Sequence, residues 1–177
     1  MADSNPQMIQ NKAVVGDDWR VLRLQAGDNA DNVEISHGKV IVPLGVWLAQ
    51  KATLRLRTDL GVWLGCDETL AELGSEPNRF AVIAIHFPIF SDGRGYSLAY
   101  QLRAHFGYRG QLRAIGDVLR DQMFYLQRVG FDAFTPRPDR NIHDALQGLN
   151  DFSERYQASW DEPLPLSRRV QRNGVKT

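Results

Sequence analysis

The sequence predicts an α/β protein with about four consecutive βα units, a mostly parallel sheet and an N-terminal β hairpin. From residue 60 onward, short apolar runs alternate with segments of helical periodicity, which is the pattern of parallel βα units. Before them, residues 33–42 hold two β-rich arms around His37-Gly38, which is typical of a hairpin. A partial βα-barrel and an open sheet both fit this order, and the absence of an obvious crossing-back connection favours the partial barrel.

Four strands are expected in the second part of the chain, and each is a short apolar run. They cover residues 61–64, 80–87, 111–115 and 132–135. Earlier in the chain, the run from Trp19 alternates apolar with charged side chains, as a half-buried strand does. A short helix is expected over residues 44–52, because Pro43 ends the preceding strand and suits a helix start.

The intervening helices are predicted from apolar side chains that recur on one helical face. The expected segments are 68–73, 95–106, 117–129 and 140–156. Two of them end in Gly followed by an aromatic residue, Gly107-Tyr108 and Gly130-Phe131, as helices do when the next residue packs back on the last turn.

Three regions are expected along the 177 residues. Residues 1–16 are polar and aperiodic and predict a flexible leader, and residues 17–157 predict a single α/β domain of sufficient length to bury a core. Residues 158–177 predict a polar tail, either solvated or used as a docking segment for a partner.

The composition argues against several classes of function. The 21 basic and 21 acidic residues cancel, so nucleic acid is not expected as the main partner. No apolar run is long enough for a membrane span and the N-terminus lacks a signal-peptide pattern, so a cytoplasmic protein is expected. The single Cys66 cannot supply an iron-sulfur cluster, and the four histidines lack ligand spacing, so neither a metal nor a cofactor is predicted.

Candidate functional residues follow the strands, because ligands of parallel sheets bind beyond the carboxyl ends of the strands. The richest segment is the loop after residues 80–87, where Gly93-Arg94-Gly95 fits equally a structural turn or an anion site at a helix start. A dinucleotide site is disfavoured, since Leu98 stands where a third glycine would be needed. His86 precedes this loop as a possible base, although a structural histidine is the favoured interpretation.

Two carboxylates follow the next strand, Asp117 and Asp121. One helical turn apart, they suit acid-base chemistry or metal binding, but pairing with Arg94 and Arg113 in a salt-bridged network is favoured. The candidate ligand- or partner-binding residues are therefore His86, Asp92, Gly93, Arg94, Tyr96, Ser97, Arg113, Asp117 and Asp121. No residue is assigned a catalytic role.

The same residues resemble a known family. The segments Phe87-Pro-x-Phe-Ser-Asp-Gly-Arg-Gly-Tyr-Ser-x-Ala99, Gly110-x-Leu-Arg-Ala-x-Gly-Asp-Val-Leu-x-Asp-Gln122 and Gly130-Phe-Asp-x-Phe134 are similar to the bacterial domain of unknown function 934 family, over roughly residues 60–155. Members are commonly labelled probable oxidoreductases involved in sulfite reduction. The resemblance implies a role in reducing sulfite to sulfide, in support of the sulfite reductase haemoprotein.

Two hypotheses follow from this resemblance together with the lack of redox ligands. In the first, the protein is an accessory partner that docks on sulfite reductase through its Arg-rich second half and its tail. In the second, it is a small enzyme or binder that holds a sulfur oxyanion or a nucleotide at the loop of Asp92 and Arg94, with Arg113 and Asp117. The first is favoured, because the chain has no redox centre of its own.

Overall fold

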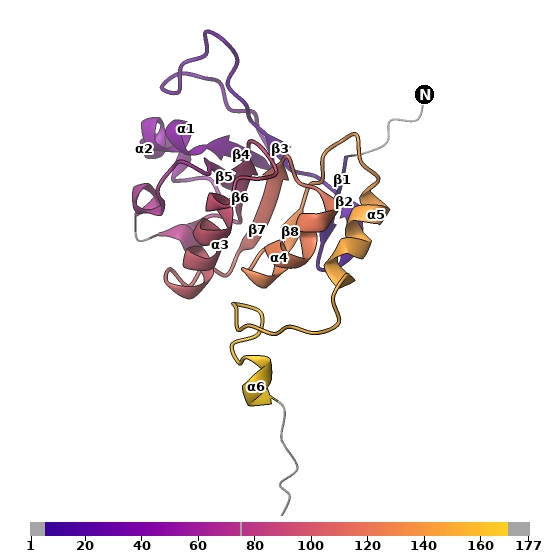
Figure 1. Cartoon of the computed structure of the whole chain (residues 1–177). Coiled ribbons are helices and arrows are strands. Elements are labelled where there is room, and N and C mark those ends of the chain that lie inside the picture. Colours follow the sequence, from indigo (N-terminus) through magenta and orange to yellow (C-terminus); the bar gives the residue numbers. More distant parts are fainter. Residues whose placement is uncertain (1–5, 75, 170–177) are drawn as a thin grey trace, which may run out of the picture.

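The computed structural model describes residues 6–74 and 76–169 and shows a curled, mixed eight-stranded sheet in the form of a half-barrel, with helices packed on it (Figure 1). The strand order is β2-β1-β8-β7-β6-β5-β4-β3; the six strands from β3 to β8 are parallel to one another, and β1 pairs antiparallel with both β8 and β2. The predicted α/β class with a mostly parallel sheet is thus confirmed.

The strands are β1 (Gln7–Gln10), β2 (Ala13–Gly16), β3 (Arg20–Val21), β4 (Val40–Pro43), β5 (Leu60–Gly65), β6 (Val82–Phe87), β7 (Gln111–Gly116) and β8 (Ala133–Phe134). The α-helices are α1 (Leu44–Ala49), α2 (Lys51–Leu54), α3 (Arg94–Ala104), α4 (Met123–Arg128), α5 (Ile142–Gln147) and α6 (Leu166–Arg169). Short 3-10 helices cover η1 (Leu70–Leu73), η2 (Pro77–Arg79), η3 (Arg120–Gln122) and η4 (Gly148–Asn150).

The N-terminal hairpin lies elsewhere in the chain than the sequence predicted. Its strands are β1 and β2, inside the segment expected to be a flexible leader, and its two-residue turn places Asn11 and Lys12 at φ 49° and 64°. The expected hairpin over residues 33–42 is wrong, because only its second arm forms a strand. That strand, β4, pairs in parallel with β3 and β5, so its partners come from other parts of the chain.

The four strands predicted after residue 60 are present as β5 to β8, but the connections are less regular than four βα units. Between β5 and β6 the chain forms only the 3-10 helices η1 and η2, so the first expected unit has no α-helix. The helix expected over 117–129 begins as η3 and continues as α4, and the one over 140–156 ends with η4 at Asn150. Among the described residues, no helix is long and apolar enough to cross a membrane.

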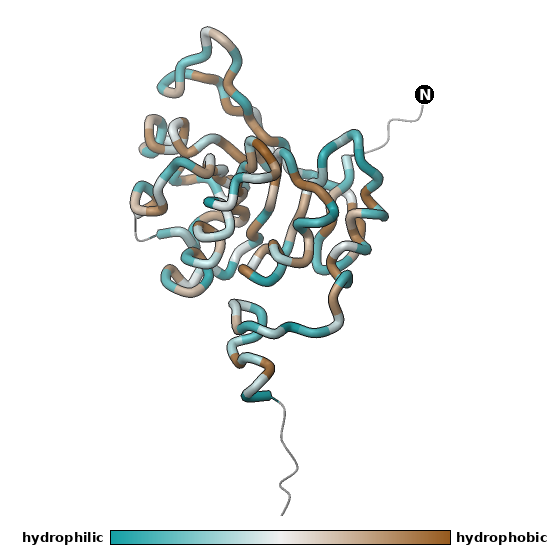
Figure 2. The backbone as a smooth tube through the Cα atoms, viewed as in Figure 1, coloured by the Kyte–Doolittle hydropathy of each residue, from teal (hydrophilic) through white to brown (hydrophobic). Residues whose placement is uncertain are grey.

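The main core lies between the sheet and the helices, where alternate strand residues such as Leu64, Ile85 and Leu112 meet helix residues such as Leu102 and Leu126. The central strands are the most hydrophobic part of the chain in Figure 2, whereas the outer loops are largely hydrophilic. The opposite face of the sheet carries a smaller apolar cluster without helical residues. Its members are Ile41, Val82, Ala84 and Ile115, with Trp19, Val21 and Trp63 packed against them.

Within the expected polar tail, residues 159–161 pack on α4, whereas α6 projects away from the domain (Figure 1). Arg128 donates to Asp161 at 3.3 Å and to the Gln157 carbonyl, and its own carbonyl accepts from the Ser159 hydroxyl at 2.8 Å. Trp160 lies over Gly130, where an added Cβ would be 3.1 Å from the indole Cδ1. The expectation of a solvated tail is therefore corrected for residues 159–161, while residues 170–177 lie outside the described range.

Candidate functional site

The carboxyl ends of the parallel strands bring three segments together. They are the loop after β6 that leads into α3, the turn after β7, and the segment of residues 135–141 after β8. Two carboxylates, Asp92 and Asp117, hold these segments in place. Their partners determine what the edge can do chemically.

Asp117 joins all three segments. Its Oδ2 accepts from the Phe90 main-chain N–H at 2.9 Å, and its Oδ1 accepts from Arg137 Nη1 at 3.0 Å. Arg137 also forms a two-pronged pair with Asp139, with both N–O distances 2.7 Å, and this pair lowers the pKa of Asp139 to about 2. The partner expected for Asp117 was Arg113 or Arg94, and Arg137 was not singled out in the sequence.

The arginine of the Gly-Arg-Gly turn is paired with a carboxylate at short range. Arg94 Nη2 lies 2.7 Å and Nε 3.0 Å from the Asp92 oxygens, and the Arg94 main-chain N–H donates to Asp92 Oδ1 at 3.1 Å. The same hydrogen bonds hold the pKa of Asp92 below its ordinary value. An anion approaching this turn would have to compete with Asp92 for the guanidinium.

The two glycines of the turn have different environments. At Gly95 a Cβ would lie 2.6 Å from Phe87 Cζ and 3.1 Å from Cys66 Sγ, so the start of α3 fits against β6 only without a side chain. At Gly93 nothing lies within 4 Å of an added Cβ. Close helix-sheet packing explains Gly95, which favours the structural-turn interpretation over an anion-binding one.

Gln122 is the residue that holds the β6 loop from the other side, and it was absent from the candidate set. Its amide donates to the Phe90 carbonyl at 2.7 Å and accepts from the Leu119 N–H at 2.8 Å, so both main-chain polar groups of Phe90 are bound. Burial raises the pKa of the nearby Tyr96 hydroxyl. The signal for this residue in the sequence was its place at the end of the segment Gly110–Gln122, which resembles the family.

The loop held in this way exposes two large apolar side chains at the edge of the sheet. Ile89 and Phe90 are each 56% exposed, although the main chain between β6 and α3 is fixed by Asp117 and Gln122. An apolar side chain on a fixed main chain loses little conformational freedom when it is covered by another molecule. The edge thus offers a preorganised apolar contact.

Cys66, at the end of β5, lies beneath this loop and is almost fully buried. Its thiol donates to the His86 carbonyl at 3.3 Å, and burial raises the pKa of the thiol to about 11, with the Asp92 charge adding to the effect. The thiol is therefore protonated at neutral pH and is a poor nucleophile.

The other candidate residues lie away from the group around Asp92 and Asp117 at this edge of the sheet. Arg113 and His86 point to the opposite face of the sheet, where Arg113 is buried against Asp17 at 2.8 Å and the His86 ring lies 5.6 Å from that of Trp63. Burial lowers the pKa of His86. Ser97 is exposed on the outer side of α3, and Asp121 is exposed at a cleft beside Arg140.

The structure thus brings together Asp92, Gly93, Arg94, Tyr96 and Asp117, but not His86, Ser97, Arg113 or Asp121. Among residues 6–74 and 76–169, no group of three His, Cys, Asp or Glu side chains is placed to hold a metal ion.

Residues 61–167 match the model of the family described as "Bacterial protein of unknown function (DUF934)". Neither the curated proteins nor the solved structures contain a match. The matched range runs from the second residue of β5 through β8, includes Asp92, Arg94, Asp117, Gln122 and Arg137, and covers more than half of the chain. The chain therefore belongs to the bacterial DUF934 family.

Proposed function

We propose that this protein is a cytoplasmic accessory protein of assimilatory sulfate reduction, which supports the reduction of sulfite to sulfide by docking on the sulfite reductase haemoprotein. The observation that carries the docking part is the fixed loop that exposes Ile89 and Phe90. The choice of pathway comes from the labels that members of this family carry.

The charges around the loop support a binding role over catalysis. Arg94 and Arg137 are each joined to carboxylates, and the nearby Cys66 thiol is protonated at neutral pH. Such pairs present a polar rim of both signs around two apolar side chains, which is the usual anatomy of a protein interface.

The alternative function is a small enzyme or binder that acts on a sulfur oxyanion or a nucleotide at the same edge. It needs a cationic group that is free to meet the ligand. The two arginines closest to the loop are engaged by Asp92, Asp117 and Asp139, so the geometry favours this alternative less.

The test is size-exclusion chromatography of the chain with the sulfite reductase haemoprotein of its own organism, followed by a sulfite reduction assay with and without the chain. The expected result is co-elution with altered turnover. The double variant Ile89→Asp/Phe90→Asp should elute separately, since two charges replace the apolar contact.

Leu56→Asp is the matched control, because Leu56 is 83% exposed and lies just after α2, outside the family match. It should co-elute like the unaltered chain. Separate elution of the unaltered chain with unchanged turnover would reject the proposal, and loss of co-elution in both variants would reject the assignment of this loop.

A further inference from the structure

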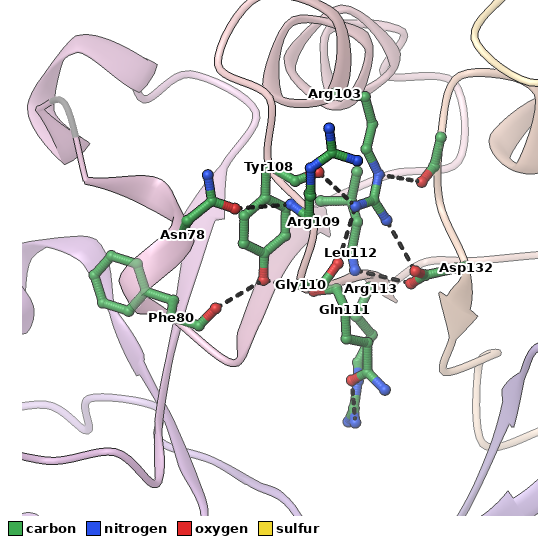
Figure 3. A network of polar contacts seen from close by, with 11 residues as sticks. Asn78, Phe80, Arg103, Tyr108, Arg109, Gly110, Gln111, Leu112, Arg113 and Asp132 are labelled. Carbon is green, nitrogen blue, oxygen red and sulfur yellow. Dashed lines mark hydrogen bonds and ion pairs between the residues drawn. The ribbon is translucent and has the colours of Figure 1, made fainter.

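A cavity of about 360 Å³ lies at the opposite edge of the sheet, where β7 and β8 begin. It is bounded by the turn after α3, by α4 and by the segment around Trp160. Its volume is within the range of small-molecule sites in proteins. Figure 3 shows the polar network along one wall of this cavity, with Arg103, Tyr108, Arg109 and Asp132.

The guanidinium of Arg103 in this wall uses four of its five N–H donors within the protein. It donates to the carbonyls of Gly130, Tyr108 and Gly110 at 2.8–2.9 Å and to the Asp132 carboxylate at 2.9 Å. The side chain is only 7% exposed. Arg103 and Asp132 therefore have a structural role in this wall of the cavity, and their charges neutralise each other.

Arg109 differs from Arg103 in that its guanidinium is not engaged by the described residues. Its main-chain N–H donates to Asn78 Oδ1 at 2.9 Å, but its guanidinium has no hydrogen-bond or ion-pair partner within the described part of the chain. The other carboxylate of the lining, Asp161, is paired with Arg128 at 3.3 Å and Arg155 at 3.1 Å. The charge left over in the cavity is thus positive and is located on Arg109.

Two further groups define what else a ligand would meet. The indole of Trp160 lies over Gly130 and is 45% exposed, so an aromatic surface is offered at the cavity. Gln127 also lines the cavity, and its buried Oε1 has no hydrogen-bond partner among the residues described. This oxygen has almost no accessible surface, so a ligand in the cavity would meet other atoms of the Gln127 side chain.

We propose that this cavity binds a small planar aromatic anion. Its ring packs on Trp160, and its acidic group pairs with Arg109. Because Trp160 belongs to the C-terminal segment, the bound ligand also holds that segment on α4. The site is independent of the loop with Ile89 and Phe90, which lies at the other end of the strands.

Calorimetric titration with three probes tests each part of this chemistry. Indole-3-acetate has the ring and the charge, indole-3-acetamide lacks only the charge, and acetate lacks the ring. Indole-3-acetate should bind with one-to-one stoichiometry, about tenfold or more tighter than the acetamide, because a charge-assisted hydrogen bond is lost in the latter. Acetate should bind more weakly than both.

Arg109→Gln should remove the preference for indole-3-acetate without changing the fold, since only the main chain of Arg109 is bonded in the protein. Trp160→Phe should keep binding and Trp160→Ala should weaken both indole probes. Arg55→Gln, at an exposed arginine outside the cavity, is the control and should bind like the unaltered chain. Absence of saturable binding at millimolar indole-3-acetate, or equal binding by Arg109→Gln, would overturn the proposal.

Discussion

Three arginines, Arg103, Arg113 and Arg128, are buried, and each guanidinium is paired with a carboxylate. A guanidinium carries five N–H donors, so it can satisfy main-chain carbonyls and a carboxylate at the same time. Arginine supplies most of the 21 basic residues of the sequence, and this content by itself fits a recognition role and a bias of composition equally. For these three residues the structure gives a third explanation, which is internal cross-linking of the fold.

Substitution of Arg103 by Gln should lower the free energy of unfolding by about 3 kcal/mol, because three carbonyls and the Asp132 carboxylate lose their donor. Urea unfolding followed by circular dichroism measures this loss. Arg94→Gln is the control, since its side chain is 61% exposed and its pair with Asp92 is at the surface. Equal stability of the two variants would contradict the structural role of Arg103.

The buried Cys66 thiol should alkylate slowly. At pH 8 its reaction with iodoacetamide should be about a hundredfold slower in the folded chain than in the urea-unfolded chain, because the pKa of the thiol is raised from 9.0 to about 11. The free energy of unfolding should fall as pH rises from about 9 to about 11, since the unfolded thiol ionises first. A fast reaction of the folded chain at pH 8 would restore Cys66 as a candidate nucleophile.

At the scale of elements, α3 begins in contact with the end of β6, and this contact depends on Gly95. Gly95→Ala should cost about 2 kcal/mol in stability, since its methyl group would lie 2.6 Å from the Phe87 ring. Gly93→Ala, two residues earlier, has free space and should leave stability unchanged or slightly raised. Thermal denaturation of both variants separates the two glycines, and a stable Gly95→Ala protein would mean that the β6 loop can shift.

The strands and helices that the sequence predicted are those with a strong local signal. The run of apolar residues in Val82–Phe87 identifies a buried parallel strand without reference to the rest of the chain. Gln7–Gly16 was missed because its turn contains Asn11-Lys12 and lacks the glycine that marks such hairpins. The direction of Arg113 was available from strand alternation, since its neighbours Leu112 and Ala114 face the helices.

At the scale of the whole molecule, the features that the sequence did not predict are contacts between distant segments. Arg113 pairs with Asp17, 96 residues away, and β1 adds to the far edge of the sheet beside β8. Asp117 was expected at the site, but its partner Arg137 follows a different strand. Periodicity reports which face of an element is buried, whereas the choice of an ion-pair partner depends on how the sheet is assembled.

The segment after residue 157 gives the last prediction, because its docking on α4 depends on a partly enclosed ion pair. The side chains of Arg128 and Asp161 are only 11% and 13% exposed. Asp161→Asn removes the carboxylate charge that balances the Arg128 guanidinium, so it should lower the free energy of unfolding by about 1–3 kcal/mol. Asp151→Asn is matched in chemistry, but its partner Arg120 is 41% exposed and keeps a second carboxylate in Asp144, so little change is expected.

Urea unfolding and limited proteolysis of the two variants give separate measurements of this docking. Asp161→Asn should both unfold at lower urea concentration and become more susceptible to cleavage around residues 157–162, because the Ser159 and Trp160 contacts are made by the same segment. If cleavage increased while stability stayed unchanged, the segment would be an appended strap that the domain does not need. If both stayed unchanged, the Trp160 contact with Gly130 would suffice to hold it, and the cavity bounded by this segment would persist without the ion pair.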